Sequence, residues 1–209
     1  MNEFVEIKDP NCTDFEQVFQ IYEEALPASE RKSRVQVAEM VKREDYQVVA
    51  VKSGEQVVSF FVVFMSLTHE VGLLEYMGTA REARNQGLGA AMFKKAAEMA
   101  GTRPLLAEVD SEREDSADGE LRIRRKNFYF RLGCQQIEGL DYLMPQVGDS
   151  KPPVMDLLYY WKGCSTPPGH DLIRGWIKTV HAEVYGRPSD DPGIDWMMKG
   201  LTEREPNRG

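Results

Sequence analysis

The chain of 209 residues has only three cysteines, Cys12, Cys134 and Cys164, and they lie far apart. No Cys-x-x-Cys pair occurs, so neither a disulfide framework nor a zinc site is indicated. The longest apolar stretch, Val57 to Leu67, is interrupted by two serines and is too short to cross a bilayer. The first residues, Met-Asn-Glu, lack the basic start and apolar stretch of a secretory leader. We therefore expect a cytoplasmic protein with no membrane partner.

Positive charge is also scarce, because 26 lysines and arginines face 34 acidic residues and give a formal net charge of −8. Proteins that grip nucleic-acid phosphates normally carry a basic surplus, so no nucleic-acid partner is expected, and a cationic partner is mildly favoured. Internal repeats and low-complexity tracts are absent. The apolar fraction of 42% and the charged fraction of 29% are those of a globular protein with one substantial core.

The most informative stretch runs from Glu75 to Met92 and reads as a strand, a charged loop, a glycine turn and a helix. Within it, Arg84 to Gly89 has the form Arg-x-x-Gly-x-Gly. Two glycines allow a ligand to approach the backbone where a Cβ would obstruct it. The amides of a first helical turn have no partner inside the helix, and the helix dipole adds positive potential there. The stretch therefore predicts a site for a phosphate or pyrophosphate.

Several phosphate-binding motifs could explain this stretch, and a further alternative is an ordinary helix N-terminus that happens to contain two glycines. A nucleoside-triphosphatase loop needs Gly-Lys-Ser/Thr, which is absent. A dinucleotide fingerprint needs a third glycine where Met92 stands. The stretch resembles instead the acyl-CoA-binding motif of the GNAT acyltransferase superfamily, Gln/Arg-x-x-Gly-x-Gly/Ala.

The order of predicted elements is a second similarity to that superfamily. Capping boxes at Thr13 and Ser33, apolar periodicity and turn signals predict the elements. These are a strand at Phe4–Lys8, helices after Thr13 and Ser33, strands at Tyr46–Lys52, Val57–Met65 and Val71–Met77, a helix to Ala100, a strand at Leu105–Val109, a helix to Leu132, and strands at Gln135–Leu143 and Pro153–Trp161. The order β-α-α-β-β-β-α-β-α-β-β predicts an α/β fold whose mixed, mostly antiparallel sheet has helices on both faces. The acidic stretch from Glu108 to Glu120 is expected to be an exposed loop.

A third similarity is the segment Asn127 to Cys134, which resembles the family's Phe-Tyr-x-x-x-Gly-Phe, with Cys134 in place of the last aromatic. Arg122 stands where many relatives carry an asparagine that contacts the pantetheine. The basic cluster around Arg122 is either offset by the acidic loop before it, which we favour, or kept for CoA phosphates. The resemblance covers Phe4 to Trp161, and the chain is identified as a member of the superfamily.

The resemblance implies an acyl-CoA-dependent N-acyltransferase without a metal. It moves an acetyl or other acyl group to a primary amine of a small molecule or peptide. Tyr129 is then the acid that protonates the leaving thiolate, since a phenol and a thiolate have comparable basicity. The backbone of Met77, Gly78 and Thr79, at a splay in the strand, would follow the pantetheine and stabilise the oxyanion. The expected pyrophosphate site consists of Arg84, Asn85, Gln86, Gly87, Leu88, Gly89 and Ala90.

The general base is expected to be a carboxylate. Glu75 lies on the motif strand just before the proposed splay, and Glu108 and Asp110 are second choices. Glu24 and Glu30 flank the break between the first two helices, where relatives admit the acceptor. They would bind its charge, so a cationic amine is expected.

Two alternatives remain open: a fatty-acyl transferase acting on a peptide side-chain amine, and a non-catalytic module that binds acyl-CoA. We expect residues 1–162 to form the acyltransferase domain, and residues 163–209 to form a linker and a helical C-terminal extension. The apolar faces of the extension need a partner, and either the core or a homodimer is favoured over a long acyl chain.

Overall fold

The structure, a computed structural model, describes residues 2–114, 116–147, 152, 154–188 and 190–202. Of the expected strand at Pro153–Trp161, Pro153 lies outside these ranges, as do residues 189 and 203–209 of the C-terminal extension. The elements are β1 (Glu3–Ile7), α1 (Thr13–Ala25), η1 (Ala28–Glu30), α2 (Arg34–Lys42), β2 (Tyr46–Ser53), β3 (Gln56–Met65), β4 (Gly72–Thr79), η2 (Arg81–Ala83), α3 (Leu88–Ala100), β5 (Leu105–Asp110), α4 (Gly119–Arg131), β6 (Gln135–Gln136), β7 (Met155–Tyr160), α5 (His170–Glu183) and α6 (Pro192–Thr202).

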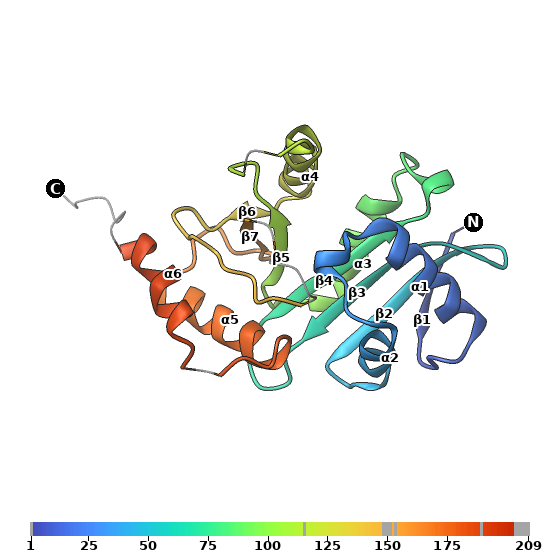
Figure 1. The fold of residues 1–209 in the computed structure, drawn as a ribbon, viewed down its shortest axis with the longest axis horizontal. Coiled ribbons are helices and arrows are strands. Elements are labelled where there is room, and N and C mark those ends of the chain that lie inside the picture. Colours follow the sequence, from blue (N-terminus) through green and yellow to red (C-terminus); the bar gives the residue numbers. More distant parts are fainter. Residues whose placement is uncertain (1, 115, 148–151, 153, 189, 203–209) are drawn as a thin grey trace.

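The described strands form one sheet in the order β1-β2-β3-β4-β5-β7-β6 (Figure 1). Every neighbouring pair is antiparallel except β4 and β5, which are parallel. The predicted order of elements and the mixed, mostly antiparallel sheet are therefore confirmed. In the described part of the chain, no helix is both long enough and apolar enough to span a bilayer.

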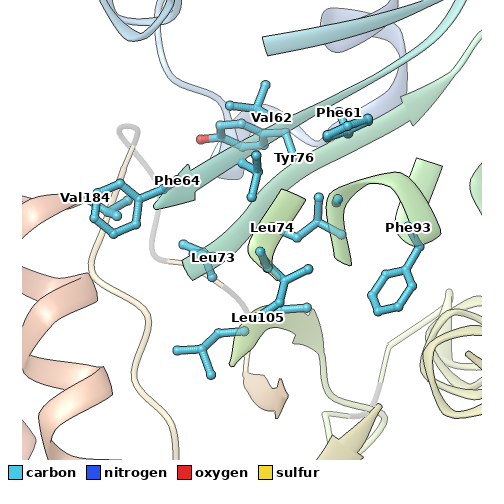
Figure 2. Packing of buried hydrophobic residues seen from close by; sticks show 14 of the residues in the cluster. Phe61, Val62, Phe64, Leu73, Leu74, Tyr76, Phe93, Leu105 and Val184 are labelled. Carbon is cyan, nitrogen blue, oxygen red and sulfur yellow. The ribbon is translucent and has the colours of Figure 1, made fainter. Parts of the chain in front are cut away.

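Helices cover both faces of the sheet, and β3 shows this residue by residue. Phe60 packs against Tyr22 of α1 with ring centroids 6.1 Å apart, while the preceding Ser59 contacts the Met92 sulfur of α3 at 2.9 Å. Successive strand residues point to opposite faces, so α1 and α3 lie on opposite sides. The centre of β3 is consequently buried on both faces, and Phe60 to Phe64 are all inaccessible to solvent. Figure 2 shows this core continuing from β3 and β4 to β5 and α3.

Local capping differs between the first two helices. The cap of α1 is Cys12, whose sulfur accepts the Phe15 amide at 3.4 Å, so the capping box expected at Thr13 is wrong. Thr13 is already helical, and its side chain is therefore not in the N-cap position. The second capping box is confirmed, because Ser33 and Gln36 bond each other's backbone amide reciprocally.

Two expectations for the second half of the chain are wrong. The strand expected at Gln135–Leu143 is only β6, and the chain then runs irregularly. The acidic stretch is not wholly exposed, since it begins inside β5 and Asp110 is buried. Its carboxylates pair with cations of α4, which is why Arg122 and Lys126 are buried as well. This pairing supports the favoured account, in which the acidic loop offsets the basic cluster.

Candidate active site

The parallel strands β4 and β5 separate soon after they meet. Their pairing is confined to Gly72 with Leu105 and Leu73 with Leu106. Beyond Leu73, β4 contains a β-bulge in its pairing with β3. Val63 pairs with Leu74 and Val62 pairs with Tyr76, so Glu75, between them, is the extra residue. The splay thus begins at Leu74, earlier than the expected distortion at Met77 to Thr79.

Gly78 does not lie at the bulge and remains paired with Phe60. A Cβ at Gly78 would come within 2.6 Å of the Phe60 ring and 3.1 Å of the Ala25 Cβ. The glycine therefore allows β4 to pack closely beneath α1.

A small cavity of about 110 Å³ fills the gap where the strands separate. It collects side chains from β4, β5, α4, η1 and the segment after α5. They are Leu74, Glu75, Tyr76, Met77, Glu108, Arg125, Tyr129 and Glu30, with Tyr185 and five apolar neighbours. The structure thus brings together Tyr129, Glu75, Met77 and Glu30, and adds the second-choice base, Glu108.

Tyr129 lies on α4 at the wall of this cavity. Its ring makes edge contacts with Phe93 and Phe128, with centroids 5.8 and 5.2 Å away, and only 8% of the residue is exposed. Burial raises the pKa of the phenol above its ordinary value. The hydroxyl is therefore protonated at neutral pH, as a proton donor must be.

Glu75 is held by two partners that sequence reasoning did not identify. One carboxylate oxygen pairs with the Lys32 ammonium, and the other accepts the Tyr46 hydroxyl at 2.8 Å. The two ionic side chains are 10% and 2% exposed, so this is a buried ion pair. Glu75 therefore already has a counterion and a hydrogen-bond donor before any acceptor arrives.

Glu108 is half-buried beside Glu75 and differs from it in its partners. Its two oxygens accept the hydroxyls of Tyr142 and Tyr185. Burial raises the pKa of Glu108 to about 7, although these hydrogen bonds act in the opposite direction. A carboxyl group with such a pKa changes its protonation state near neutral pH, which suits a general base.

The two carboxylates expected to bind the acceptor lie in different places. Glu30 lines the cavity, and burial together with the neighbouring Asp110 raises its pKa to about 7. Glu24 is exposed on α1 and lines another surface pocket with Gln17, Gln20 and Glu82. The helical repeat of α1 turns Glu24 away from the cavity that Glu30 reaches from η1.

An outer pocket of about 750 Å³ adjoins the central cavity, since Glu30 and Met144 line both. Its acidic lining is Glu30, Asp110, Glu114 and Asp118. The cation in this lining, Arg122, donates to Glu114 at 2.8 Å and to Asp118 at 3.1 Å. These contacts direct Arg122 to the acidic loop, the role favoured from the sequence.

The glycine turn forms a separate pocket of about 570 Å³ between the start of α3 and the end of α4. From the predicted pyrophosphate site it is lined by Arg84, Asn85, Gly87, Leu88, Gly89 and Ala90, and Thr79 of the predicted pantetheine strand lines it as well. The side chain of the remaining residue, Gln86, instead donates to the Glu82 carbonyl at 3.2 Å.

The backbone of this turn is shaped for a ligand. Gly87, the N-cap of α3, has a φ of 80° and offers no side-chain cap, and Asn85 also has a positive φ of 63°. A Cβ at Gly87 would meet nothing within 4 Å, and one at Gly89 would meet only the Phe128 ring, at 3.3 Å. Unpaired amides of the first helical turn consequently face open space, which is the arrangement an anion needs.

The match to known proteins follows the same features. A model described as the Acetyltransferase (GNAT) family matches residues 15–118, about half of the chain, including α1, β4 and the glycine turn. The chain belongs to the GNAT superfamily. A solved structure of similar fold is an acetyltransferase from Bacteroides thetaiotaomicron that is assigned to the GNAT family, with a TM-score of 0.74. The two proteins are 21% identical, and the match covers 89% of this chain and 99% of the Bacteroides chain.

Two further proteins are similar to the chain. YjbC of Bacillus subtilis (strain 168), assigned to the acetyltransferases, is 26% identical over 137 residues. That alignment covers 66% of each protein, so this GNAT chain spans slightly less than two thirds of the relative's length. NAA60 of Arabidopsis thaliana, solved in complex with acetyl-CoA, has a TM-score of 0.58 at 14% identity, over 78% of this chain and 100% of its own.

Proposed function

We propose that this GNAT protein transfers a short acyl group, most simply acetyl, from acyl-CoA to a primary amine of a small molecule or peptide. The observation that carries the proposal is the gap between β4 and β5. There a buried, protonated tyrosine and three carboxyl groups line one cavity, one turn of α4 away from the glycine-turn pocket.

In this proposal the CoA pyrophosphate binds the amides from Gln86 to Ala90, with Arg84 and Asn85 beside it. The pantetheine then follows β4 along Met77, Gly78 and Thr79, where the strand has no pairing with β5. NAA60, a protein of similar fold, was solved in complex with acetyl-CoA, which supports acetyl-CoA as the co-substrate. The described residues contain no cluster of three or more His, Cys, Asp or Glu side chains that could hold a metal ion.

The chemistry requires three proton movements. The acceptor ammonium gives a first proton to a base, and the free amine then forms a bond to the thioester carbonyl carbon. As the carbon–sulfur bond breaks, the leaving thiolate takes the Tyr129 proton, while the nitrogen releases its second proton through solvent, which restores the Tyr129 hydroxyl. We assign the base to Glu108 in preference to Glu75, because its pKa is raised to about 7 whereas Glu75 is paired with Lys32.

The size of the cavity favours a short acyl group over the fatty-acyl alternative. A volume of about 110 Å³ is well below the roughly 300 Å³ at which pockets for drug-sized ligands begin. The convergence of Tyr129 with Glu108 and Glu30 favours catalysis over a module that only binds acyl-CoA.

The outer pocket favours an acceptor that carries positive charge. Glu30, Asp110, Glu114 and Asp118 outnumber Arg122 along the path into the central cavity. An ammonium group would be attracted by these carboxylates, whereas an acidic acceptor would be repelled. Glu24 lies outside this outer pocket, so the proposed acceptor site does not include it.

The test begins with calorimetry of CoA and acetyl-CoA binding, followed by a panel of cationic and acidic amines with detection of the free thiol. Tyr129→Phe should lower kcat by about 10²-fold while the Kd for CoA stays the same, because the variant lacks only the proton donor. Tyr159→Phe is the matched control, since its buried hydroxyl donates to Gln135 at 2.7 Å on β6, outside the cavity. Absence of CoA binding, or a Tyr129→Phe turnover within twofold of the parent, would overturn the proposal.

A further inference from the structure

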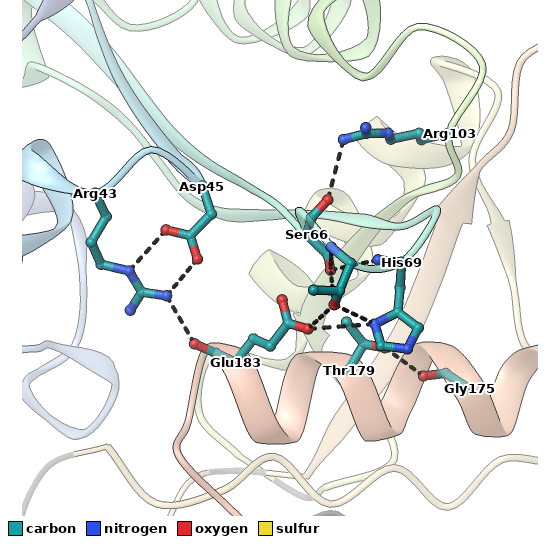
Figure 3. Close-up of polar contacts among 9 residues, drawn as sticks. Arg43, Asp45, Ser66, His69, Arg103, Gly175, Thr179 and Glu183 are labelled. Atoms are coloured by element: carbon teal, nitrogen blue, oxygen red, sulfur yellow. Dashed lines mark hydrogen bonds and ion pairs between the residues drawn. The ribbon is translucent and has the colours of Figure 1, made fainter.

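The C-terminal extension is fixed to the first half of the sheet at the last turn of α5. The Glu183 carbonyl accepts from Arg43 at 3.2 Å, and the Glu183 carboxylate accepts the Thr68 hydroxyl at 2.8 Å and lies 3.4 Å from His69 (Figure 3). Arg43 is itself held by Asp45 through bonds of 2.9 and 2.6 Å. The start of β2 and the β3–β4 turn thus determine where α5 ends.

The apolar face of α5 is buried against the core, which is one of the two arrangements expected from the sequence. Trp176 packs against Tyr159 and Trp161 with centroids 5.9 and 5.8 Å away. Val184, just after the helix, is buried in the same core cluster as Phe64 of β3 (Figure 2). This face is therefore not available to a long acyl chain.

The residue after Val184 extends this packing into the central cavity. The Tyr185 hydroxyl donates to one oxygen of Glu108, and its ring lies 5.4 Å from the Lys32 ammonium that pairs with Glu75. Tyr142 donates to the other Glu108 oxygen. Both oxygens of the carboxylate are thereby oriented by groups far away in the sequence.

We propose that Tyr185 is a positioning residue of the transfer site, which holds the Glu108 carboxylate toward the acceptor and sets the pH range in which it accepts a proton. The inference rests on the proposed function, because Glu108 must be the base. It also makes the C-terminal extension part of the active site.

The groups around Glu108 determine the direction of the effect. Burial and the Glu75 charge raise its pKa, while the two tyrosine hydroxyls and Lys32 lower it. Glu30, Tyr76, Arg125 and Tyr129 complete the charged and titratable lining of the cavity. His181 packs against both tyrosine rings, and its pKa of about 4 keeps it neutral at assay pH.

Removing the Tyr185 hydroxyl takes away one of two donors that stabilise the charged form. A hydrogen bond to a charged group contributes enough to move a pKa by about one to two units. The acidic limb of the kcat/KM profile should therefore move to higher pH by about that amount in Tyr185→Phe. The CoA affinity should not change, since the glycine turn is untouched.

The experiment measures kcat/KM for an acceptor against pH, on the full chain with acetyl-CoA. Tyr185→Phe and Tyr142→Phe should both shift the acidic limb upward. The control Tyr159→Phe removes an equivalent buried hydroxyl and should not shift it. Circular dichroism and CoA calorimetry establish that each variant is folded and binds its co-substrate.

Two results separate this inference from the proposed function. An active parent whose acidic limb is unmoved in Tyr185→Phe, or moved equally in Tyr159→Phe, overturns the inference alone. A parent that binds no CoA and releases no thiol with any amine overturns the proposed function, and the inference falls with it.

Discussion

The buried ion pair between Lys32 and Glu75 yields a prediction about stability. Lys32→Met removes the ammonium but keeps most of the length of the side chain, and it leaves a carboxylate that is 2% exposed and still accepts the Tyr46 hydroxyl at 2.8 Å. Breaking a buried pair on one side costs about 3–5 kcal/mol. Because Tyr46 still stabilises the carboxylate, we expect the lower end, about 3 kcal/mol.

Urea unfolding followed by circular dichroism measures this loss. With a slope of about 2 kcal/mol per molar urea, the midpoint should fall by about 1.5 M. Lys42→Met is the matched control, since Lys42 pairs with Glu39 on the surface at exposures of 55% and 60%, and it should change stability by less than about 1 kcal/mol. The double variant with Glu75→Gln should be more stable than the sum of the single variants predicts. A loss below about 1 kcal/mol in Lys32→Met, or strict additivity, would refute the reasoning.

Two further predictions concern single residues. Gly78→Ala should lower stability by about 1–3 kcal/mol in thermal unfolding, because its Cβ would lie 2.6 Å from the Phe60 ring; an unchanged Tm would contradict the packing role. Burial lowers the pKa of His181 from 6.5 to about 4, so the unfolded chain binds the extra proton first, and stability is lost as pH falls from 6.5 to 4, by about 3 kcal/mol in total. As the pH falls across that window, the urea midpoint of His181→Phe should fall less steeply than that of the parent protein. Glu30 and Glu108 act in the opposite direction, because their raised pKa values favour the folded state at low pH. Their contributions are present in both proteins and cancel in the comparison. Parallel pH dependence in parent and variant would rule out this role for His181.

The order of the elements was predictable because its determinants are local. Apolar periodicity, glycines such as Gly101 at a helix end and turn signals such as Ser53-Gly54 act within a few residues. The glycine turn was predictable for the same reason, since the positive φ of Gly87 and the start of the helix after it depend on neighbouring residues alone.

The partners of the carboxylates could not be predicted in this way. Glu108 is oriented by Tyr142 and Tyr185, which lie 34 and 77 residues away in the sequence, and neither belongs to a motif. The position of Glu24 outside the central cavity was not predictable either, because a carboxylate near a helix end can face either side, and its direction depends on how the helix packs. The buried pairing of Lys32 with Glu75 likewise depends on tertiary structure.

The two wrong predictions of local structure, the cap of α1 and the length of β6, also have physical causes. Cys12 was not considered as a cap because a thiol is a weaker acceptor than the Thr13 hydroxyl one residue later. The strand expected beyond Gln136 has apolar residues such as Ile137 and Leu140, but these are buried without continuing the ladder to β7. Burial alone does not distinguish a strand from an irregular segment that covers the core.

The short pairing between β4 and β5 has a mechanical consequence. Two residue pairs, at Gly72 and Leu73, join the half-sheet β1–β4 to the half-sheet β5–β7–β6. The extension bridges this hinge, because Glu183 is bonded to the first half whereas Tyr185 and Trp176 contact the second. During synthesis both half-sheets emerge before the segment that braces them, so the angle between the halves, and with it the width of the gap, becomes fixed only when the last fifth of the chain has folded.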